Sequence, residues 1–242
     1  MDTQTGQTQG AASNPREAVT RQTLTTEAAL NILPTVSPPA DSAGYRFVKR
    51  LMDILGALLL LMFGFPVVLA VALLIRVTGP GPVLFRQTRL GLNGTEFSLF
   101  KFRTMVVSAE RQLADYADMR QRFEESFKIA NDPRITPVGA FLRKTSLDEL
   151  PQVVNVLQGS MSLIGPRPIV PIEMGKYGPC GEKLLTVKPG LGGMWQTHGR
   201  SDTTYAERIA LDMYYIEHRS VWLDLYLLVK TAACVLTRRG SC

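Results

Sequence analysis

Residues 145–152 have the sequence Thr-Ser-Leu-Asp-Glu-Leu-Pro-Gln, and the rest of the chain is best interpreted by working outward from them. Apolar residues recur at helical spacing from Leu150 to Leu157, so a helix is expected to begin here, with Pro151 in its first turn. Asp148 and Glu149 then lie at the helix N-terminus. One interpretation is a capping box, in which Ser146 caps the helix and Glu149 reaches back toward it.

The second interpretation is a site for phosphates and a metal. Arg143 and Lys144 precede the two acids, and Gly165-Pro166-Arg167-Pro168 follows them. The two prolines fix the backbone around Arg167, so its guanidinium would lose little entropy on binding an anion. A rigid connector with an exposed arginine is the alternative for this loop. Carboxylates that lie between cations, next to a rigid loop, favour a site for phosphates and a divalent metal.

The composition limits the class of protein. A chain of 242 residues with 45% apolar residues allows one ordinary domain plus appendages. The formal net charge of +6 favours anionic partners, namely a phospholipid surface, phosphorylated substrates or nucleic acid, although no nucleic-acid-binding motif is recognisable. Three widely spaced cysteines and two histidines give neither a disulfide framework nor the material for a histidine-rich metal centre. They fit a reducing compartment.

Three segments differ in composition. Residues 1–44 are rich in Thr, Gln, Ser, Ala and Pro, which predicts a disordered tail without a secretory signal. Residues 45–78 contain the apolar run Ile54–Ile75, which has no charged side chain. As a straight helix these 22 residues would measure about 33 Å, against about 30 Å for the hydrocarbon core of a bilayer. Residues 79–242 are expected to form the catalytic domain.

The topology of the apolar run depends on Pro66 and on the charges around it. Pro66 removes a helical hydrogen bond, so a kink near the middle is expected. Basic residues occur on both sides of the run, and a membrane-spanning helix would expose one of these groups outside the cell. We therefore expect a re-entrant helix whose two ends lie in the cytoplasm. A single-span anchor and a buried core helix are the alternatives.

The remaining pattern predicts an α+β fold that is mainly helical. A small antiparallel hairpin is expected from 83–87 and 97–102, because Asn-Gly between them is a strong turn signal. Residues 188–196 form a glycine-rich loop without Walker spacing, whose glycines serve either close backbone approach or turns. An amphipathic helix is expected over 108–130 and a short helical turn over 137–144. Much of 206–236 is expected to be helical, and its Trp and Tyr suit a membrane interface as well as a core.

Several motifs, taken together, resemble the bacterial sugar transferases. These are the monotopic polyprenyl-phosphate phosphoglycosyl transferases that begin exopolysaccharide and O-antigen assembly. The resemblance runs from about residue 45 to the C-terminus and is carried by Lys49-Arg50-x-x-Asp53, residues 101–105, 142–152, 162–168, 189–191 and Trp195-Gln196. It implies a re-entrant membrane helix and transfer of a sugar 1-phosphate from a UDP-sugar to undecaprenyl phosphate, with UMP released and Mg²⁺ required.

The resemblance also implies roles for individual residues. Asp148 falls on the family's nucleophile and Glu149, the second catalytic acid, on the residue that binds Mg²⁺. Phosphate and nucleotide binding are expected of the positions Arg143, Arg167, Pro168, Lys101, Arg103 and Arg200. This assignment agrees with the residue chemistry, because phosphoryl transfer depends mostly on positioning and charge stabilisation. The chain departs from the family's usual residues at Gly192, His198, His218 and Arg219, which leaves the sugar and the membrane docking open.

The implied partners are a UDP-sugar, undecaprenyl phosphate, the membrane and downstream glycosyltransferases, with a homodimer left open. Galactose or glucose is the expected sugar. The implied location is the bacterial inner membrane, with the active site on its cytoplasmic face. A membrane-anchored scaffold, whose acids cap a helix and whose arginines bind lipid headgroups, is the competing hypothesis.

Overall fold

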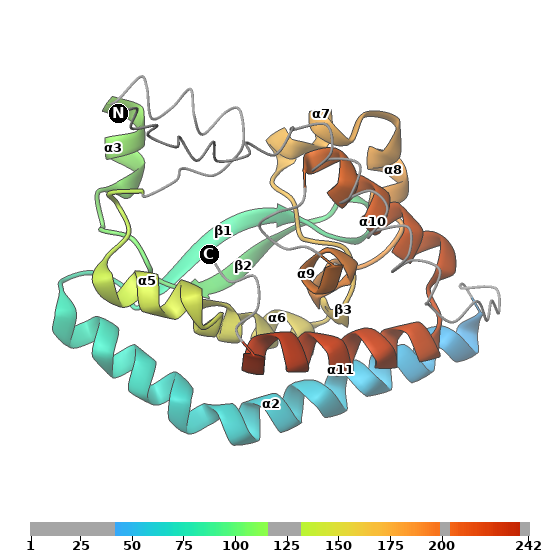
Figure 1. Cartoon of the computed structure of the whole chain (residues 1–242), viewed down its shortest axis with the longest axis horizontal. Coiled ribbons are helices and arrows are strands. Elements are labelled where there is room, and N and C mark those ends of the chain that lie inside the picture. The colour runs from blue at the N-terminus through green and yellow to red at the C-terminus, as the bar shows by residue number, and fades with distance from the viewer. Residues whose placement is uncertain (1–41, 116–131, 199–203, 238–242) are drawn as a thin grey trace, which may run out of the picture. The chain divides into compact units, whose positions relative to one another are not determined.

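A computed structural model describes residues 42–115, 132–198 and 204–237. Its longest element is the helix α2 (Ala43–Thr78), which begins at the N-cap Ser42 and contains Pro66. Figure 1 shows that α2 bends near its middle, so that its two halves form a wide angle. The bend agrees with the kink expected from the proline, although the helix begins well before the apolar run.

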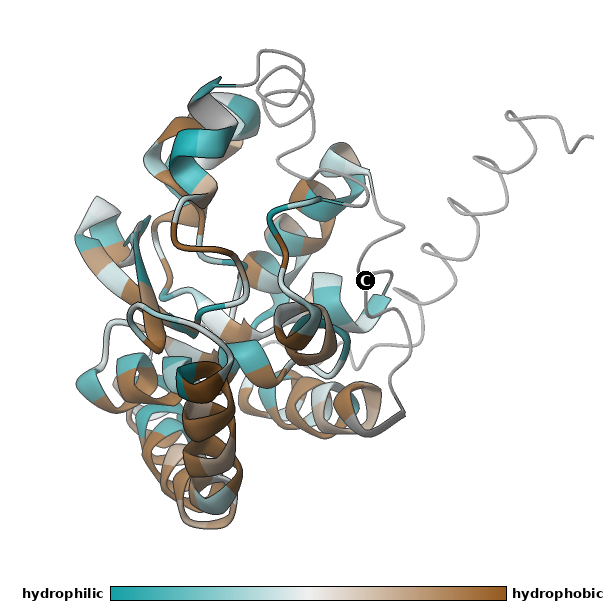
Figure 2. Cartoon of the chain, turned by 90° about the vertical axis from the view of Figure 1, so that its left-hand side faces the viewer, coloured by the Kyte–Doolittle hydropathy of each residue, from teal (hydrophilic) through white to brown (hydrophobic). Residues whose placement is uncertain are grey.

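The surface of α2 is mostly apolar. Among the described residues, α2 alone is long and apolar enough to cross a membrane by length and composition, and only 11% of its most apolar 18-residue window is buried. Figure 2 shows an almost continuously hydrophobic ribbon along one half of this helix. Exposed side chains such as Phe63 (73% exposed) and Leu73 (63%) would be unfavourable in water. These features are compatible with membrane association.

The predicted hairpin is confirmed. Strand β1 (Leu84–Leu90) pairs antiparallel with β2 (Glu96–Phe102), and both strands are longer at the turn than the sequence pattern indicated. The 3₁₀ turn η1 (Leu92–Gly94) joins them, with Asn93 in the left-handed region at φ 55°. Asn tolerates this conformation better than most residues, which explains why Asn-Gly marked the turn correctly.

A second, smaller sheet was not predicted. Strand β3 (Ser162–Ile164) pairs in parallel with β4 (Gly190–Gly192), which lies in the glycine-rich loop. A Cβ atom at Gly190 would lie 2.1 Å from the backbone nitrogen of Gly165. A side chain at this position would therefore push the Gly165 segment away from β4. The glycines therefore serve close backbone approach, which was one of the two alternatives.

Helices make up most of the described structure. The short helix α5 (Pro137–Lys144) is confirmed, and the C-terminal helical segment consists of α10 (Tyr205–His218) and α11 (Val221–Thr237). The expected helix over 108–130 is described only as α3 (Ala109–Asp115), and 116–131 lie outside the described residues. The other short helices are α6 (Val153–Gln158), η3 (Pro171–Glu173), α7 (Met174–Tyr177), η4 (Gly178–Cys180), α8 (Gly181–Leu184) and α9 (Met194–His198).

The N-terminal half of α2 is fixed to the rest of the protein by polar contacts. Asp224 on α11 is 1% exposed and accepts hydrogen bonds from the hydroxyls of Tyr45 (2.8 Å) and Tyr215 (2.7 Å). Lys49 lies 2.9 Å from the same carboxylate. One turn further along, Asp53 accepts from the backbone N–H of Leu163 on β3 (2.8 Å). Figure 1 shows α11 running alongside this half of α2.

The C-terminal half of α2 is fixed by apolar packing instead. Val71 and Ile75 are buried in a cluster with Phe102 of β2 and Leu142 of α5. Both halves of the helix therefore contact the same body of strands and short helices. Helix α2 therefore packs against the rest of the fold on each side of its bend.

Candidate active site

The two acids lie in a 3₁₀ turn, η2 (Leu147–Gln152), which precedes α6. Ser146 is in the left-handed region (φ 56°), and its side chain makes no capping hydrogen bond. The capping-box interpretation is therefore wrong. Pro151 belongs to the 3₁₀ turn and not to the first turn of α6, so the acids do not lie at the N-terminus of a long helix. A left-handed serine costs backbone energy, and such strain is concentrated at functional sites.

This turn is held between α2 and the hairpin. Leu147 and Leu150, on either side of the acids, pack against the α2 cluster described above. From α6, the amide of Asn155 accepts from the N–H of Phe100 (3.1 Å) and donates to the carbonyl of Ser98 (2.8 Å). Asn155 is 1% exposed and satisfies the free edge of β2 with its side chain. Both faces of the turn are thus anchored, which fixes the acids relative to α2.

Burial and neighbouring charges set the ionisation of the acid pair. Asp148 is buried, with 8% of its surface exposed. Desolvation, assisted by the neighbouring Glu149 carboxylate, raises the pKa of Asp148 to about 6, while Lys101 and Arg143 act in the opposite direction. The Nζ atom of Lys101 lies 2.7 Å from Glu149 Oε1 in an ion pair. At neutral pH Asp148 is therefore a poorly solvated carboxylate, which favours reaction with an electrophile.

The structure brings together some of the predicted substrate-binding residues. Lys101 and Arg143 both lie near the acid pair, and Arg143 Nε donates to Thr104 Oγ1 (3.0 Å). Arg103, by contrast, donates to the carbonyls of Pro80 (2.6 Å) and Gly79 (3.2 Å), so it holds the loop that follows α2. Arg200 lies outside the described residues.

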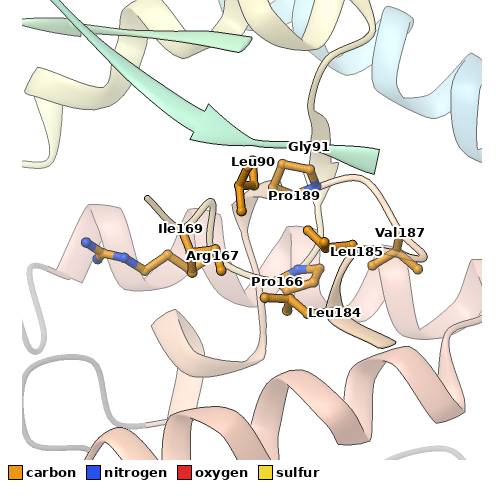
Figure 3. A pocket seen from close by; sticks show the side chains of 9 residues that line it. All are labelled: Leu90, Gly91, Pro166, Arg167, Ile169, Leu184, Leu185, Val187 and Pro189. Atoms are coloured by element: carbon orange, nitrogen blue, oxygen red, sulfur yellow. The ribbon is translucent and has the colours of Figure 1, made fainter. Parts of the chain in front are cut away.

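Arg167 and Pro168 form a neighbouring part of the site. In Figure 3, the guanidinium of Arg167 points away from a small cavity lined by Pro166, Ile169, Leu184 and their neighbours. The guanidinium lies instead over the indole of Trp195, at 5.2 Å from the ring centroid. Pro168 is buried, and its carbonyl accepts from Arg89 Nη1 (2.8 Å). The proline-flanked loop is therefore not a simple surface connector.

Arg89 is a site residue that the sequence analysis missed. In the hairpin register, Phe85 is paired with Lys101 and Arg89 with Phe97, so Lys101 and Arg89 project from the same face. Arg89 is 8% exposed and lies 3.7 Å from Glu173, and burial lowers its pKa to about 10. Arg89 could not be recognised from the sequence, because only the register of β1 and β2 shows that this face of the hairpin joins the acid pair to the Arg167 loop.

The acid pair is suited to a divalent metal that is shared with a substrate. In the part of the chain that the structure describes, no group of three or more Asp, Glu, His or Cys side chains could hold a metal alone. Mg²⁺, however, is usually bound through one or two carboxylates, substrate phosphates and waters. Asp148 and Glu149 supply such carboxylates next to Lys101 and Arg143, so the residues fit the expected ion.

The four departures from the family's usual residues lie away from the acid pair. A Cβ atom at Gly192 would approach Thr231 of α11 to 2.8 Å, so the glycine allows close packing there. His198 Nε2 accepts a hydrogen bond from Lys230 Nζ (3.0 Å), and burial lowers the pKa of His198. His218 stacks on Tyr214, with ring centroids 4.1 Å apart. Arg219 follows the end of α10. All four therefore concern the packing around α10 and α11.

Comparison with known proteins shows the family of this chain. Residues 44–238 match the family described as Bacterial sugar transferase. The undecaprenyl-phosphate galactose phosphotransferase of Salmonella typhimurium is 43% identical over 201 residues, which are 81% of this chain and 42% of that protein. The UDP-glucose:undecaprenyl-phosphate glucose-1-phosphate transferase of Xanthomonas campestris is 42% identical, covering 80% of this chain and 40% of that protein.

A third relative is similar along most of its length. The exopolysaccharide production protein ExoY of Rhizobium meliloti is 40% identical over 197 residues, which are 80% of this chain and 87% of that protein. The chain thus spans less than half of the Salmonella and Xanthomonas relatives, but nearly all of the Rhizobium protein. The matched segment contains α2, both sheets and the acid turn.

Proposed function

This chain belongs to the bacterial sugar transferase family, and on that premise we propose that it transfers a sugar 1-phosphate from a UDP-sugar to undecaprenyl phosphate, releasing UMP. The observation that carries the proposal is the buried Asp148 carboxylate beside the Lys101–Glu149 ion pair and Arg143, fixed directly on the apolar helix α2. A membrane-anchored scaffold would not require a buried carboxylate surrounded by cations. The names of the Salmonella and Xanthomonas relatives favour galactose or glucose as the sugar.

The proposed reaction has two steps. An oxygen of Asp148 attacks the β-phosphorus of the UDP-sugar, and the bond from this phosphorus to the bridging oxygen breaks. The bonding electron pair leaves with UMP, and the sugar phosphate stays on Asp148. The phosphate oxygen of undecaprenyl phosphate then attacks the same phosphorus and restores the carboxylate. Asp148 needs no general base, because an ionised carboxylate is already a nucleophile.

The cations around Asp148 have matching roles. Arg143 and Lys101 stabilise charge that shifts toward the departing UMP, because charge stabilisation is the largest contribution in phosphoryl transfer. Glu149 would hold Mg²⁺ with Asp148 beside it, and the bound ion would neutralise the diphosphate of the donor. Lys101 holds the Glu149 carboxylate in place by donating a hydrogen bond to it.

A direct assay tests the proposed function. Purified protein is incubated with Mg²⁺, undecaprenyl phosphate and each of a panel of UDP-sugars, and UMP release is measured. We expect UMP to form with UDP-galactose or UDP-glucose and only when the lipid phosphate is present for repeated turnover. If none of the panel releases UMP, although the protein is folded, the proposed function is wrong.

The activity should depend on pH through Asp148. The attacking carboxylate must be ionised, and burial raises its pKa to about 6. We therefore expect kcat/KM, which reports the free enzyme, to fall about tenfold per pH unit below pH 6. An aspartate with the ordinary pKa of 3.8 would keep full activity down to pH 5. A flat profile between pH 7 and pH 5 would contradict the burial argument.

We further propose that α2 enters and leaves the membrane on the cytoplasmic side of the inner membrane. Its N-terminal half is held by Asp224, and its C-terminal half packs against Phe102 and Leu142, so both halves contact one body. A helix that crossed the bilayer would separate one set of these contacts from the other. The packing therefore supports the re-entrant topology that the charges on both flanks favoured.

Labelling of single cysteines tests this topology. With Cys180, Cys234 and Cys242 replaced by Ser, a cysteine is placed either at Ser37 or at Thr78, and intact cells receive a membrane-impermeant thiol reagent. We expect neither position to react until the membrane is permeabilised, when both should react. Reaction at Ser37 alone in intact cells would mean that α2 spans the membrane. Pro66→Leu should increase that reaction, because it removes the cause of the bend.

A further inference from the structure

A second group of charges lies at the far end of the hairpin face from the acid pair. This arginine cluster consists of Arg89, Arg167 and Arg208 with the acids Glu173 and Asp212. Glu173 is 2% exposed and Asp212 is 1% exposed. Burial raises the pKa of Asp212 to about 7, so its negative charge is incomplete at neutral pH. Three guanidinium groups thus face fewer than two full negative charges, and the cluster carries excess positive charge.

The cluster also contains donors whose hydrogen bonds are not made within the described part of the chain. Nitrogen atoms of all three arginines, the indole Nε1 of Trp195 and the hydroxyl of Tyr205 are buried without a hydrogen-bond partner there, and Asp212 Oδ1 is the one acceptor of the cluster in the same condition. An unpaired buried donor destabilises the folded state, so native proteins rarely collect several in one place. A group rich in acceptors would satisfy them together.

Two of these arginines lie over aromatic rings. The guanidinium of Arg208 lies 4.7 Å from the ring centroid of Tyr205 and 5.9 Å from that of Trp195, and Arg167 lies over the same indole. Behind them, Tyr177 donates to Asp212 Oδ2 (2.8 Å), and Asp212 faces both arginines. Arg167, Trp195 and Arg208 are only partly buried, so a ligand can reach them from solvent.

The position of the cluster indicates which part of the donor it meets. Arg89 is four residues along β1 from Phe85, the partner of Lys101, which is about 14 Å of backbone. In the proposed reaction the sugar phosphate stays on Asp148, so the rest of the donor extends away from the acid pair. That remainder is a nucleoside phosphate, which has the negative charge and the acceptor oxygens that the cluster lacks.

We propose that Arg208, together with Trp195 and Tyr205, binds the nucleoside monophosphate half of the donor beside Arg167. This inference rests on the proposed function and adds Arg208 to its binding residues. Arg208 and Arg167 contact the phosphate and ribose oxygens, and the nearby Asp212 carboxyl interacts electrostatically with both arginines. Arg89 positions the Arg167 loop through its bond to the carbonyl of Pro168.

Intrinsic fluorescence offers a test that does not depend on turnover. The chain has two tryptophans, and Trp222 is 64% exposed on α11, so Trp222→Phe leaves Trp195 as the reporter inside the cluster. The full-length protein in detergent is titrated with UMP, uridine or inorganic phosphate. We expect a saturable change in Trp195 fluorescence with UMP, and much weaker binding of uridine and of phosphate.

Substitutions in this background identify the contact. Arg208→Gln should weaken UMP binding by about 10- to 100-fold, because a charged hydrogen bond to phosphate is lost, and change uridine binding by about twofold or less. Arg208→Lys should be intermediate, since it keeps the charge but not the planar fork. Lys183→Gln, which removes an exposed cation paired with Glu217 on the same side of the fold, should have no effect.

Two results would overturn the inference: an unchanged UMP affinity in Arg208→Gln, or equal weakening of UMP and uridine by that variant. If Arg208→Gln does not fold, Tyr205→Phe replaces it, and a UMP affinity lowered by about threefold or more is then required. The two proposals fail separately. Normal UMP release with unchanged UMP binding in Arg208→Gln removes only the subsite, whereas UMP binding without any release removes only the reaction.

Discussion

Asp148→Asn is expected to abolish UMP release, by at least ~10⁴-fold, without unfolding the protein. Asparagine keeps the size of the side chain and can still accept a hydrogen bond, but its amide oxygen is a very weak nucleophile. Turnover is measured by UMP release with UDP-sugar, Mg²⁺ and undecaprenyl phosphate. Glu149→Gln is the matched control, because it should weaken metal binding and recover part of its activity in excess Mg²⁺.

The same substitution should also stabilise the fold at neutral pH. Folding raises the pKa of Asp148 from 3.8 to about 6, so the folded protein loses stability as the pH rises through this interval. The full effect above pH 6 is about 3 kcal/mol, and burial of the asparagine amide offsets part of it. We expect Asp148→Asn to be about 1–2 kcal/mol more stable at pH 7, and the gain to disappear near pH 4. An inactive but destabilised variant would point to a structural role for Asp148.

Asp224→Ala is expected to cause the largest loss of stability. It removes the acceptor of the Tyr45 and Tyr215 hydroxyls and leaves Lys49 without its carboxylate. Breaking a buried ion pair by removing one partner costs about 3–5 kcal/mol. For a protein of this size, the unfolding midpoint in detergent should fall by roughly 10 °C. The N-terminal half of α2 should then become accessible to protease.

An exposed ion pair supplies the control for this prediction. Glu217→Ala removes the partner of Lys183, and both side chains are about half exposed, so the expected loss is below about 1 kcal/mol. Replacing Lys49 and Asp224 together by Met and Leu should cost less than Asp224→Ala alone, because no buried charge is left unpaired. Equal midpoints for Asp224→Ala and Glu217→Ala would show that Asp224 does not anchor α2.

Local patterns in the sequence predicted the elements that depend on local physics. The hairpin followed from Asn93-Gly94 and the bend in α2 from Pro66, and the short helical turn expected over 137–144 is α5. The capping box was wrong because a Ser-x-x-Glu spacing says nothing about backbone conformation. Ser146 adopts left-handed angles, which turn its side chain away from the capping position.

Contacts between distant segments could not be predicted in the same way. The pairing of β3 with β4 joins residues that are 28 apart in the chain, and each strand has only three residues. Asn155, which holds the edge of β2, and Arg89, which holds the Arg167 loop, have no sequence signal, because their roles depend on tertiary register. The two acids were found from their charged neighbours, but their burial and raised pKa required the fold.

The central claim is that Asp148 carries the sugar phosphate during the reaction. It is tested most directly without the lipid acceptor, by mixing the protein with a UDP-sugar labelled in the sugar and with Mg²⁺. The account predicts that the wild-type protein retains the label in a hydroxylamine-sensitive bond and releases UMP in roughly stoichiometric amount, whereas Asp148→Asn retains none. A wild-type protein that holds no label, yet turns over normally once undecaprenyl phosphate is added, would contradict the covalent mechanism.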